Sequence, residues 1–391
     1  MQQKTNRSLT YTILSISLLT VMAGAAMAPA LGVIREHFTA YSDLMVQFIV
    51  SLPALFIIVT NLLFSWLCKL MKTKTLAIVG LSLYVLAGAG AYFIDNIWLL
   101  LFFRALLGVS VGMVMPLSTG LLAYYFPPEQ QASLMGLSAA MNQMGGAVAT
   151  LLSGFLAGIS WNCAFLVYLL GLISLGLVVA FLPNERLAKD KVENAEKQSI
   201  GKLMKKFHPS VVGMLLAMAL FFIYPTNFAI TSLSNTALSS NTITLIMVGL
   251  DLIAFVGGLF FGQLMRPLRK SMKYVAPVGF LLGYFFLSLD TTIGLLILGS
   301  VFIGIANAMS VPYLNTIASI KGGKDAATTV MPLISAALYL GQFLSPLVVN
   351  PCSRLLGGVT APYQVGVIMA VLFLIQTICT RKYQMLPPEE R

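Results

Sequence analysis

Two charged side chains stand deep inside long apolar stretches of this sequence. Arg104 is the only charged residue between Ile97 and Phe126, and Asp251 lies in the stretch MVGLDLIAF. An ionisable group in a nonpolar medium costs free energy, so such residues are rare and are functional candidates by default. Arg104 and Asp251 are therefore the first residues to consider for ion or solute handling.

The two residues have different chemical capacities. Asp251 can bind and release a proton, which predicts a proton-coupling acid; the alternative is a structural hydrogen bond to Asn142 or Gln143. A guanidinium group stays charged in any site. Arg104 could therefore bind an anionic solute group, pair with Asp251, or organise its own helix through carbonyl contacts. We expect Arg104 and Asp251 together to serve proton coupling.

A wider set of uncharged side chains lies in the same apolar stretches. Amide and hydroxyl groups can bind a solute, but they also commonly form hydrogen bonds between helices. Methionine thioethers adapt their shape and suit a pocket for varied apolar molecules, although they also serve as apolar filler. The residues that we expect to line a substrate cavity are Asn227, Asn307, Tyr224, Asn142, Gln143, Met115 and Tyr313.

These residues belong to a chain that is too apolar for a water-facing globule. Of its 391 residues, 58% are hydrophobic and 9% are charged, whereas a soluble domain carries about 25% charged residues. A membrane-spanning helix needs about 20 apolar residues. Windows of that length predict an all-α polytopic membrane protein with twelve transmembrane helices, at residues 9–34, 44–68, 75–94, 97–124, 131–157, 161–182, 210–234, 242–265, 274–289, 292–317, 326–350 and 361–380.

Two features of these windows carry further expectations. The seventh span is expected to be broken at Tyr224-Pro225-Thr226-Asn227, and the ninth to be short. The runs are continuously apolar, which excludes the alternating pattern of a transmembrane β-barrel. The two histidines are far apart and the four cysteines are isolated, so no metal site and no cofactor are expected.

The basic residues predict the orientation of the chain. If the N-terminus is cytoplasmic, Arg35, Arg104 and Arg354 are the exceptions among 24 Lys and Arg residues that otherwise fall in cytoplasmic loops and tails. Basic residues beside spans favour the cytoplasm. We therefore expect a multi-pass protein of the cell inner membrane with both termini cytoplasmic. The net charge of +11 reflects this topology and requires no nucleic acid.

The two halves of the chain resemble each other when one is shifted by 196 residues, the separation of Pro29 from Pro225. The basic segment 183–208 divides the chain into an N-terminal six-helix bundle (1–182) and a C-terminal one (209–391). Proline kinks a helix and glycine allows close packing, so ordinary membrane packing is the alternative explanation for any one match. The expected packing and gating positions are Gly108, Gly112, Pro116, Pro29, Pro225, Gly304, Pro312, Gly145 and Gly341.

The shift also shows what is not repeated. It places Ser300 opposite Arg104 and Leu55 opposite Asp251, so a shared scaffold does not require either charge. Two bundles of the same orientation predict a pseudo-two-fold axis along the membrane normal, with a solute cavity between them.

Three stretches carry a resemblance to the major facilitator superfamily over nearly the whole chain. LFFRALLGVSVG (101–112) resembles its fourth-span motif, LLAYYFPPEQQASLMGLSAAMNQMGG (121–146) its passage from the fourth to the fifth span, and SWNCAFLVYLLGLISLGLVVAFLPNE (160–185) its sixth span. The chain looks most like the bacterial arabinose-efflux-permease-like and drug-exporter groups. The resemblance implies that spans one, four, seven and ten line the cavity, and that Arg104 handles protons.

Two stretches depart from that family's pattern. In FSWLCKLMKTK (64–74), Phe64 and Cys68 stand where the family usually has Gly and Asp, and only the basic residues of the loop remain. In GGAVATLLSG (145–154), Thr150-Leu151 replaces the Gly-Pro of the exporters' fifth span. Transport is therefore predicted more firmly than export.

The sequence predicts a secondary active transporter that moves a small organic solute by alternating access. Proton-coupled efflux of a drug or metabolite by an antiporter is the leading hypothesis, and proton-coupled import of a sugar or organic anion is the alternative. No ATP-binding loop of the GxxxxGK[ST] type is present, so an ion gradient must drive uphill movement. An intramembrane enzyme is not expected, because it would need a nucleophile and base or a metal cluster. The expected partners are the solute, protons and membrane lipids, and the expected state is a monomer.

Overall fold

The computed structural model describes residues 2–126, 128–184, 200–235, 238–265, 268, 271–289, 292–322, 330–381 and 383. Every regular element in these ranges is a helix, as the sequence predicted. The elements are α1 (Gln2–Ala25), α2 (Leu31–His37), α3 (Asp43–Leu70), α4 (Thr73–Ala89), η1 (Gly90–Phe93), α5 (Ile97–Tyr125), α6 (Pro128–Ala157), η2 (Trp161–Leu170), α7 (Gly171–Phe181), α8 (Ile200–Asn235), α9 (Ser240–Met265), α10 (Met272–Leu289), α11 (Ile293–Gly322), α12 (Met331–Leu356) and α13 (Ala361–Cys379).

The long helices correspond to the predicted spans. Among the described residues, 11 helical segments are long and apolar enough to cross a membrane. The remaining long helix is α6, with 30 residues, at the fifth predicted span. Residues 185–199 of the predicted linker and 326–329 of the eleventh span lie outside the described residues.

The first and sixth spans are less regular than the sequence predicted. The first span was expected at 9–34, but α1 ends at Ala25 and a turn separates it from α2. Pro29 accounts for this end, because its ring has no amide hydrogen and would clash with the carbonyl of Ala25. The sixth span begins as the 3-10 helix η2 and continues as α7.

The seventh span corrects an expectation. We predicted a break at residues 224–227, but α8 runs through Pro225 without interruption. Two side chains after the proline bind carbonyl oxygens of the turn before it. Thr226 Oγ1 donates to the Phe222 carbonyl at 2.5 Å, and Asn227 Nδ2 donates to the Ile223 carbonyl at 2.9 Å. The carbonyl that Pro225 leaves without a helical donor is that of Phe221, so these two bonds add contacts to the next two carbonyls of the same turn.

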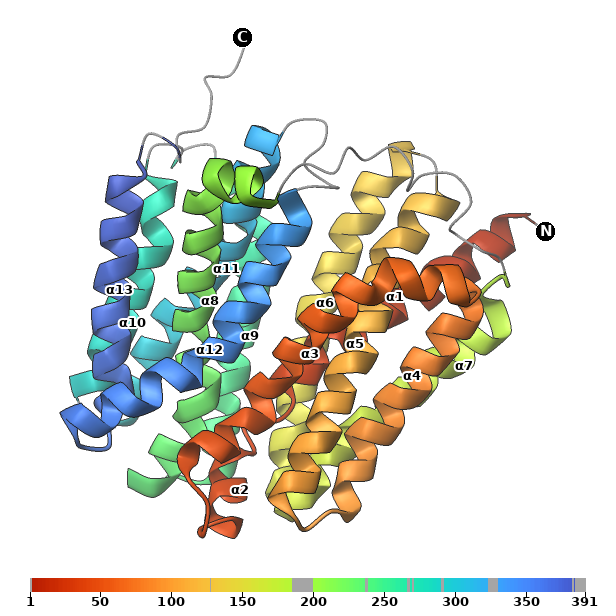
Figure 1. The fold of residues 1–391 in the computed structure, drawn as a ribbon. Helices are drawn as coiled ribbons and strands as arrows, with labels where there is room; N and C mark the ends of the chain where they lie inside the picture. Colours follow the sequence, from red (N-terminus) through yellow and green to blue (C-terminus); the bar gives the residue numbers. More distant parts are fainter. Residues whose placement is uncertain are drawn as a thin grey trace. The chain divides into compact units, whose positions relative to one another are not determined.

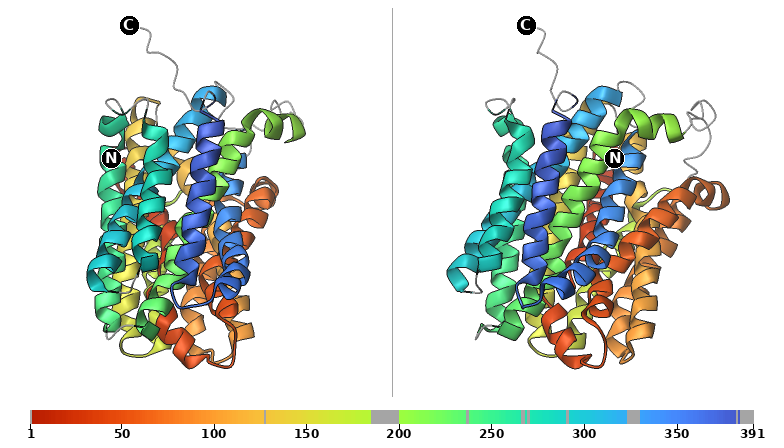
Figure 2. Two further views of the ribbon diagram at one scale, coloured as in Figure 1. Left: turned by 90° about the vertical axis from the view of Figure 1, so that its left-hand side faces the viewer. Right: turned by 60° about the vertical axis from the view of Figure 1, so that its left-hand side comes forward.

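The chain divides into two compact units, Met1–Glu193 with Leu238–Val248, and Asn194–Ala237 with Gly249–Arg391. In the first unit, α5 packs against α1, α3 and α4, while α1 also packs against α6 (Figure 1). In the second unit, α8 packs against α11, α12 and α13, and α10 packs against α11 and α13. Figure 2 shows the helices of each unit running alongside one another. The boundaries at residues 182 and 209 remain a prediction.

Pairs of glycines occupy the same packing positions in the two units. A Cβ on Gly145 of α6 would overlap the Leu18 carbonyl oxygen of α1, and a Cβ on Gly341 of α12 would overlap the Leu215 carbonyl oxygen of α8. The partners, like the glycines, are about half the chain apart. These helices approach so closely that only glycine fits between the backbones.

A second pair acts in the same way. A Cβ on Gly108 of α5 would overlap the Pro53 carbonyl oxygen of α3. On Gly304 of α11 it would lie 3.1 Å from the Leu250 carbonyl oxygen of α9. The sequence repeat therefore corresponds to a repeat in the packing of the helices.

Candidate functional site

Arg104 lies in the second turn of α5 and is completely buried. Its Nε atom donates to the Ile49 carbonyl of α3 at 2.5 Å. One terminal nitrogen donates to the Ala23 carbonyl of α1 at 2.7 Å, and the other to the Tyr168 hydroxyl of η2 at 2.7 Å. The guanidinium group thus joins four helices of the first unit.

The two carbonyl groups that Arg104 binds are ones that their own helices leave open. The helical donor for the Ile49 carbonyl would be the amide of residue 53, which is Pro53 and has no N–H. The Ala23 carbonyl lies in the last turn of α1, where carbonyl groups lack helical donors and attract positive charge. Proline and a helix end therefore create the site that accepts the guanidinium group.

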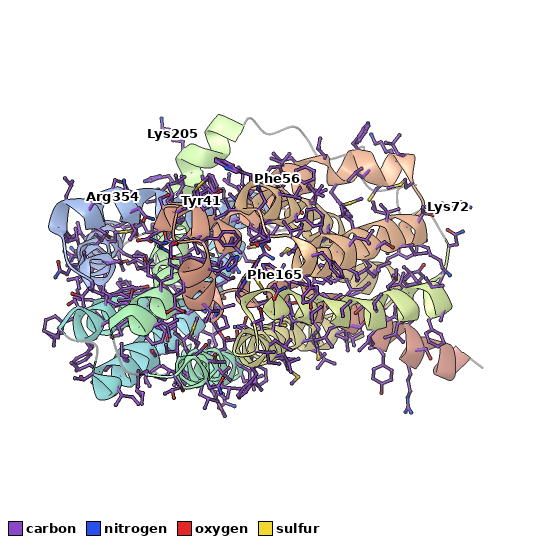
Figure 3. All side chains as sticks on the ribbon, turned by 90° about the horizontal axis from the view of Figure 1, so that it is seen from below. Tyr41, Phe56, Lys72, Phe165, Lys205 and Arg354 are labelled. Carbon is purple, nitrogen blue, oxygen red and sulfur yellow. The ribbon has the colours of Figure 1, made fainter. Side chains whose placement is uncertain are left out.

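The Tyr168 hydroxyl completes this arrangement. It accepts a hydrogen bond from Arg104 and donates one to the Ala23 carbonyl at 3.0 Å. Its ring lies 5.5 Å from the guanidinium carbon and meets the Tyr84 ring edge to face. Phe165 on the same helix, labelled in Figure 3, is fully buried as well. In the described part of the chain, no carboxylate lies within ion-pair distance of Arg104.

Asp251 belongs to the second unit and lies on α9, where it is half-buried. It interacts electrostatically with the Tyr224 hydroxyl of α8. Gly304 of α11 packs against Leu250 and Ile253, one residue before and two residues after Asp251. Asp251 is therefore positioned where α9 crosses α11.

Tyr224 and Ser300 form a buried hydroxyl pair beside this crossing. Their oxygen atoms are 2.7 Å apart, and Ser300 also donates to the Leu296 carbonyl at 2.7 Å. Tyr224 is 1% exposed and stacks on Phe228, with ring centroids 4.3 Å apart. Ser300 is the residue that the repeat places opposite Arg104. At this position the first unit therefore links its helices through a charged side chain, and the second unit links them through a neutral hydroxyl pair.

Two of the predicted side-chain amides, those of Asn227 and Asn142, form hydrogen bonds within their own units. The Asn227 amide nitrogen donates to the Ile223 carbonyl and, at 3.0 Å, to the Thr226 hydroxyl. In the first unit, the Asn142 side-chain oxygen accepts from the Thr20 hydroxyl of α1 at 2.8 Å. The Asn307 backbone carbonyl accepts from the Ser310 hydroxyl at 3.2 Å.

The remaining cavity candidates divide between the units. Gln143 and Met115 are half-buried in the first unit, and Tyr313 is 5% exposed in the second. Asp251 and Tyr224 belong to the same unit. In the described residues, no group of three His, Cys, Asp or Glu side chains could hold a metal ion.

The candidate list omitted the tyrosines that surround both sites. Tyr84 and Tyr168 in the first unit match Tyr284 and Tyr363 in the second. Tyr84 donates to the Leu19 carbonyl of α1, and Tyr284 to the Leu220 carbonyl of α8. A sequence signal for this match exists, because YLLG (168–171) recurs as YQVG (363–366). Gly171 packs against Tyr84, and Gly366 against Tyr284.

Comparison with known protein families gives one broad match. The family model described as Major Facilitator Superfamily matches residues 13–346. Among curated proteins, the chain is similar to the quinolone resistance protein NorA of Staphylococcus aureus (strain MRSA252), with 26% identity over 219 residues. That match spans 53% of this chain and 53% of NorA, so it covers about half the length of the relative.

Solved structures extend the likeness to the whole fold. A D-xylose-proton symporter aligns with a TM-score of 0.75 and 18% identity, over 97% of this chain and 98% of its own. The nucleoside transporter NupG aligns with a TM-score of 0.73 and 15% identity, over 97% and 100%. At these identities the likeness concerns the fold. It confirms the predicted architecture of twelve transmembrane helices in two six-helix bundles.

Proposed function

The chain belongs to the major facilitator superfamily, and from this premise we propose that it is a proton-coupled exporter of small organic solutes. Members of this superfamily are transporters that span the membrane many times, and this chain is such a transporter rather than an enzyme. Proton coupling, export and the kind of solute are the finer parts of the proposal. Each rests on a separate feature of the two units.

The placement of Asp251 carries the proposal of proton coupling. Of the two charges deep in the spans, Arg104 is bound by two carbonyls and a hydroxyl of its own unit. Asp251 is half-buried on α9, next to Leu250, which packs against Gly304 of α11. A carboxyl group in such surroundings can gain and lose a proton as its access to water changes. We therefore assign proton exchange to Asp251.

Arg104 was predicted to share this coupling role. Its contacts favour a structural role, in which its hydrogen bonds hold α5 against α1 and α3. The coupling role stays a prediction that transport measurements can separate from the structural one. If Arg104→Ala is expressed normally and transports fully, Arg104 is a packing residue; a variant that folds but loses coupling would restore the predicted role.

The engaged amides support an apolar or amphipathic solute. A sugar is bound through many hydrogen bonds to its hydroxyl groups, and a site for it needs available polar partners. Asn227 and Asn142 are already engaged within their own units. The similarity to NorA, a protein named for quinolone resistance, also supports export. Proton-coupled import of a sugar or an organic anion remains the alternative, since the similar folds include a D-xylose-proton symporter.

The proposed setting follows from the distribution of basic residues. We propose that the protein resides in the cell inner membrane with both termini in the cytoplasm, as the positive-inside rule indicates. It would act as a monomer surrounded by membrane lipids, with protons and the solute as its ligands.

The decisive experiment replaces Asp251 with Asn in proteoliposomes that contain a pH-sensitive dye. We expect the variant to lose solute-driven proton flux, because asparagine cannot exchange a proton. Asp95→Asn is the matched control, since Asp95 pairs with His37 in an exposed position outside the long helices. Unchanged proton flux in Asp251→Asn would refute the coupling role.

The solute itself can be found by a thermal-shift screen. The purified protein is heated with a broad library of small molecules at two pH values, and a compound that binds the native state raises its stability. We expect amphipathic molecules to give shifts that depend on pH. Stabilisation by sugars alone would favour the importer instead.

A further inference from the structure

A lysine side chain is buried at one end of the second unit. Lys273 is the second residue of α10 and is 7% exposed, although a lysine is rarely this buried unless it is paired. Its Nζ atom donates to the Arg381 carbonyl at 3.4 Å, which is longer than a usual hydrogen bond of this kind. Because an ammonium group has three donors, Lys273 keeps the capacity to bind a further acceptor.

The accepting carbonyl belongs to a turn that follows α13. We call Thr380, Arg381 and Tyr383 the C-terminal turn, in which the Tyr383 amide donates to the Thr380 carbonyl at 2.9 Å. The Tyr383 ring centroid lies 4.6 Å from the Nζ atom of Lys321, in the last turn of α11. The Tyr383 hydroxyl accepts from Ser210 of α8 at 3.3 Å. The C-terminal turn therefore contacts two ammonium groups, one from α10 and one from α11.

The positive charge at the C-terminal turn is not balanced within the described part of the chain. No carboxylate there lies within ion-pair distance of Lys273, Lys321 or Arg381. Arg381 is itself exposed, so it adds a third cation. In the sequence, residues 200–383 include 12 Lys and Arg, 3 Asp and no Glu. Neighbouring like charges repel one another, so an anion that binds among them stabilises this end of the unit.

We propose that Lys273, Lys321 and the C-terminal turn form a binding site for the phosphate group of an anionic phospholipid. Lysine binds phosphate as a compact charge. Lys273 holds the C-terminal turn through one hydrogen and offers its other two to the phosphate oxygens, while Arg381 supplies further donors at the surface. Tyr383 is a positioning residue, because its ring holds Lys321 beside the turn while its hydroxyl is bound to α8.

The surface next to the site favours a lipid over a free phosphate ion. Ile378 of α13 lies about one turn before Arg381 and is exposed. Val278 of α10 lies about one turn after Lys273 and is exposed as well. Because α10 and α13 pack against each other, acyl chains can cover this apolar surface while the headgroup stays at the helix ends. Basic sites between membrane helices bind anionic headgroups in this way.

This inference goes beyond the proposed function, because it concerns neither the solute nor the coupling acid. It gives the lipid a structural role in the second unit. The site joins the ends of α10, α11 and α13, and Tyr383 extends it to α8. A phosphate group bound there offsets the repulsion between the cations, so the protein should be more stable when anionic lipid is present.

Native mass spectrometry of the purified full chain tests the site. The protein in a non-ionic detergent is titrated with phosphatidylglycerol, and the fraction that keeps a bound lipid gives an apparent dissociation constant. We expect Lys273→Gln to weaken this binding about tenfold, because it removes a hydrogen bond between two charged groups. Lys321→Gln, at a half-buried position, should weaken it about threefold. This second variant keeps the test valid if Lys273→Gln does not fold.

The controls separate the site from general attraction to basic residues. Lys72→Gln removes an exposed basic residue between α3 and α4 of the first unit and should leave the affinity unchanged. Phosphatidylcholine, whose headgroup has no net charge, should bind equally to the native chain and to both variants. Equal weakening in Lys72→Gln, or unchanged affinity in Lys273→Gln and Lys321→Gln, would overturn the proposal.

Inorganic phosphate distinguishes the lipid from a free anion. The thermal unfolding midpoint is measured with phosphatidylglycerol and with inorganic phosphate at equal concentrations. We expect only the lipid to raise the midpoint of the native chain, and Lys273→Gln to lose most of that rise. A rise with inorganic phosphate that disappears in Lys273→Gln would assign the site to a free anion and refute the lipid.

Discussion

Among the residues that the structure describes, Arg104 is a buried charge that hydrogen bonds compensate in place of a counter-ion. The guanidinium group donates to two carbonyl groups and one hydroxyl. Pro53 and the end of α1 leave these two carbonyl groups without helical donors. A planar group with several donors in a fixed fork matches this arrangement, and an ammonium group does not. Removing the donor leaves buried acceptors unsatisfied, which costs more than the hydrogen bond itself contributes.

This argument predicts the cost of changing Arg104. Arg104→Lys keeps the charge but cannot reach the Ile49 carbonyl, the Ala23 carbonyl and Tyr168 together. We expect it to lower the free energy of unfolding by about 3 kcal/mol, measured by thermal unfolding in detergent.

Pro53→Ala tests whether the open Ile49 carbonyl causes part of this loss of stability, because the new amide N–H can bind that carbonyl. In that background the cost of Arg104→Lys should shrink by about 1 kcal/mol. An unchanged cost would show that the hydrogen bond from Arg104 to the carbonyl left open by Pro53 does not contribute to stability.

Only part of this residue-scale detail could be predicted from the sequence. The apolar context identified Arg104 and Asp251, and the repeat showed that neither is duplicated. Their partners depend on which turn of one helix meets which turn of another, and composition carries no such information. Pro53 was a signal that a carbonyl of α3 would need a donor, but nothing in the sequence said that α5 would supply it.

At the scale of the elements, close backbone approach dominates the packing. Gly145 of α6 meets the Leu18 carbonyl of α1, and Gly341 of α12 meets the Leu215 carbonyl of α8. A methyl group at either place must push two helices apart, because a carbonyl oxygen in a helix cannot move aside. The repeat keeps both glycines for this steric reason.

Alanine substitutions test this view. We expect Gly145→Ala and Gly341→Ala each to destabilise the protein by about 2 kcal/mol through overpacking, measured as a lower thermal unfolding midpoint. Gly176→Ala in α7 is the matched control, because nothing lies within 4 Å of the added methyl group. There the higher helix propensity of alanine should be neutral or slightly stabilising. Equal losses at all three positions would contradict the packing argument.

The helices themselves were largely predictable, because apolar runs of spanning length leave the backbone no other way to satisfy its hydrogen bonds in lipid. Two of the departures concern prolines, and the third, the 3-10 start of the sixth span, does not. Pro29 ends α1 early although the first span was expected to continue to residue 34, whereas Pro225 does not interrupt α8 although a break was expected there. Thr226 and Asn227 add side-chain hydrogen bonds to two carbonyls of the turn before Pro225. A proline alone therefore does not decide whether a spanning helix is interrupted.

At the scale of the whole molecule, the direction of transport has meaning only once the chain is oriented in the membrane. The orientation decides which side of the membrane each loop and helix end faces. Three exposed basic side chains labelled in Figure 3 serve as markers: Lys72 between α3 and α4, Lys205 in α8, and Arg354 near the end of α12. The positive-inside rule assigns Lys72 and Lys205 to the cytoplasm and Arg354 to the other side. Export would then carry solute toward the side of Arg354.

Cysteine labelling tests this orientation. The native thiols Cys68, Cys163, Cys352 and Cys379 are all free, so they are first replaced by serine or alanine. In that background, Arg354→Cys should react with a membrane-impermeant maleimide in intact cells. Lys72→Cys and Lys205→Cys should react only in inside-out vesicles, which serve as the accessibility control. Labelling of Lys72→Cys in intact cells would show that the chain has the opposite orientation to the one predicted. An exporter in that case would have to move solute toward the side of Lys72, so the same vesicles should be used to measure the direction of solute and proton movement.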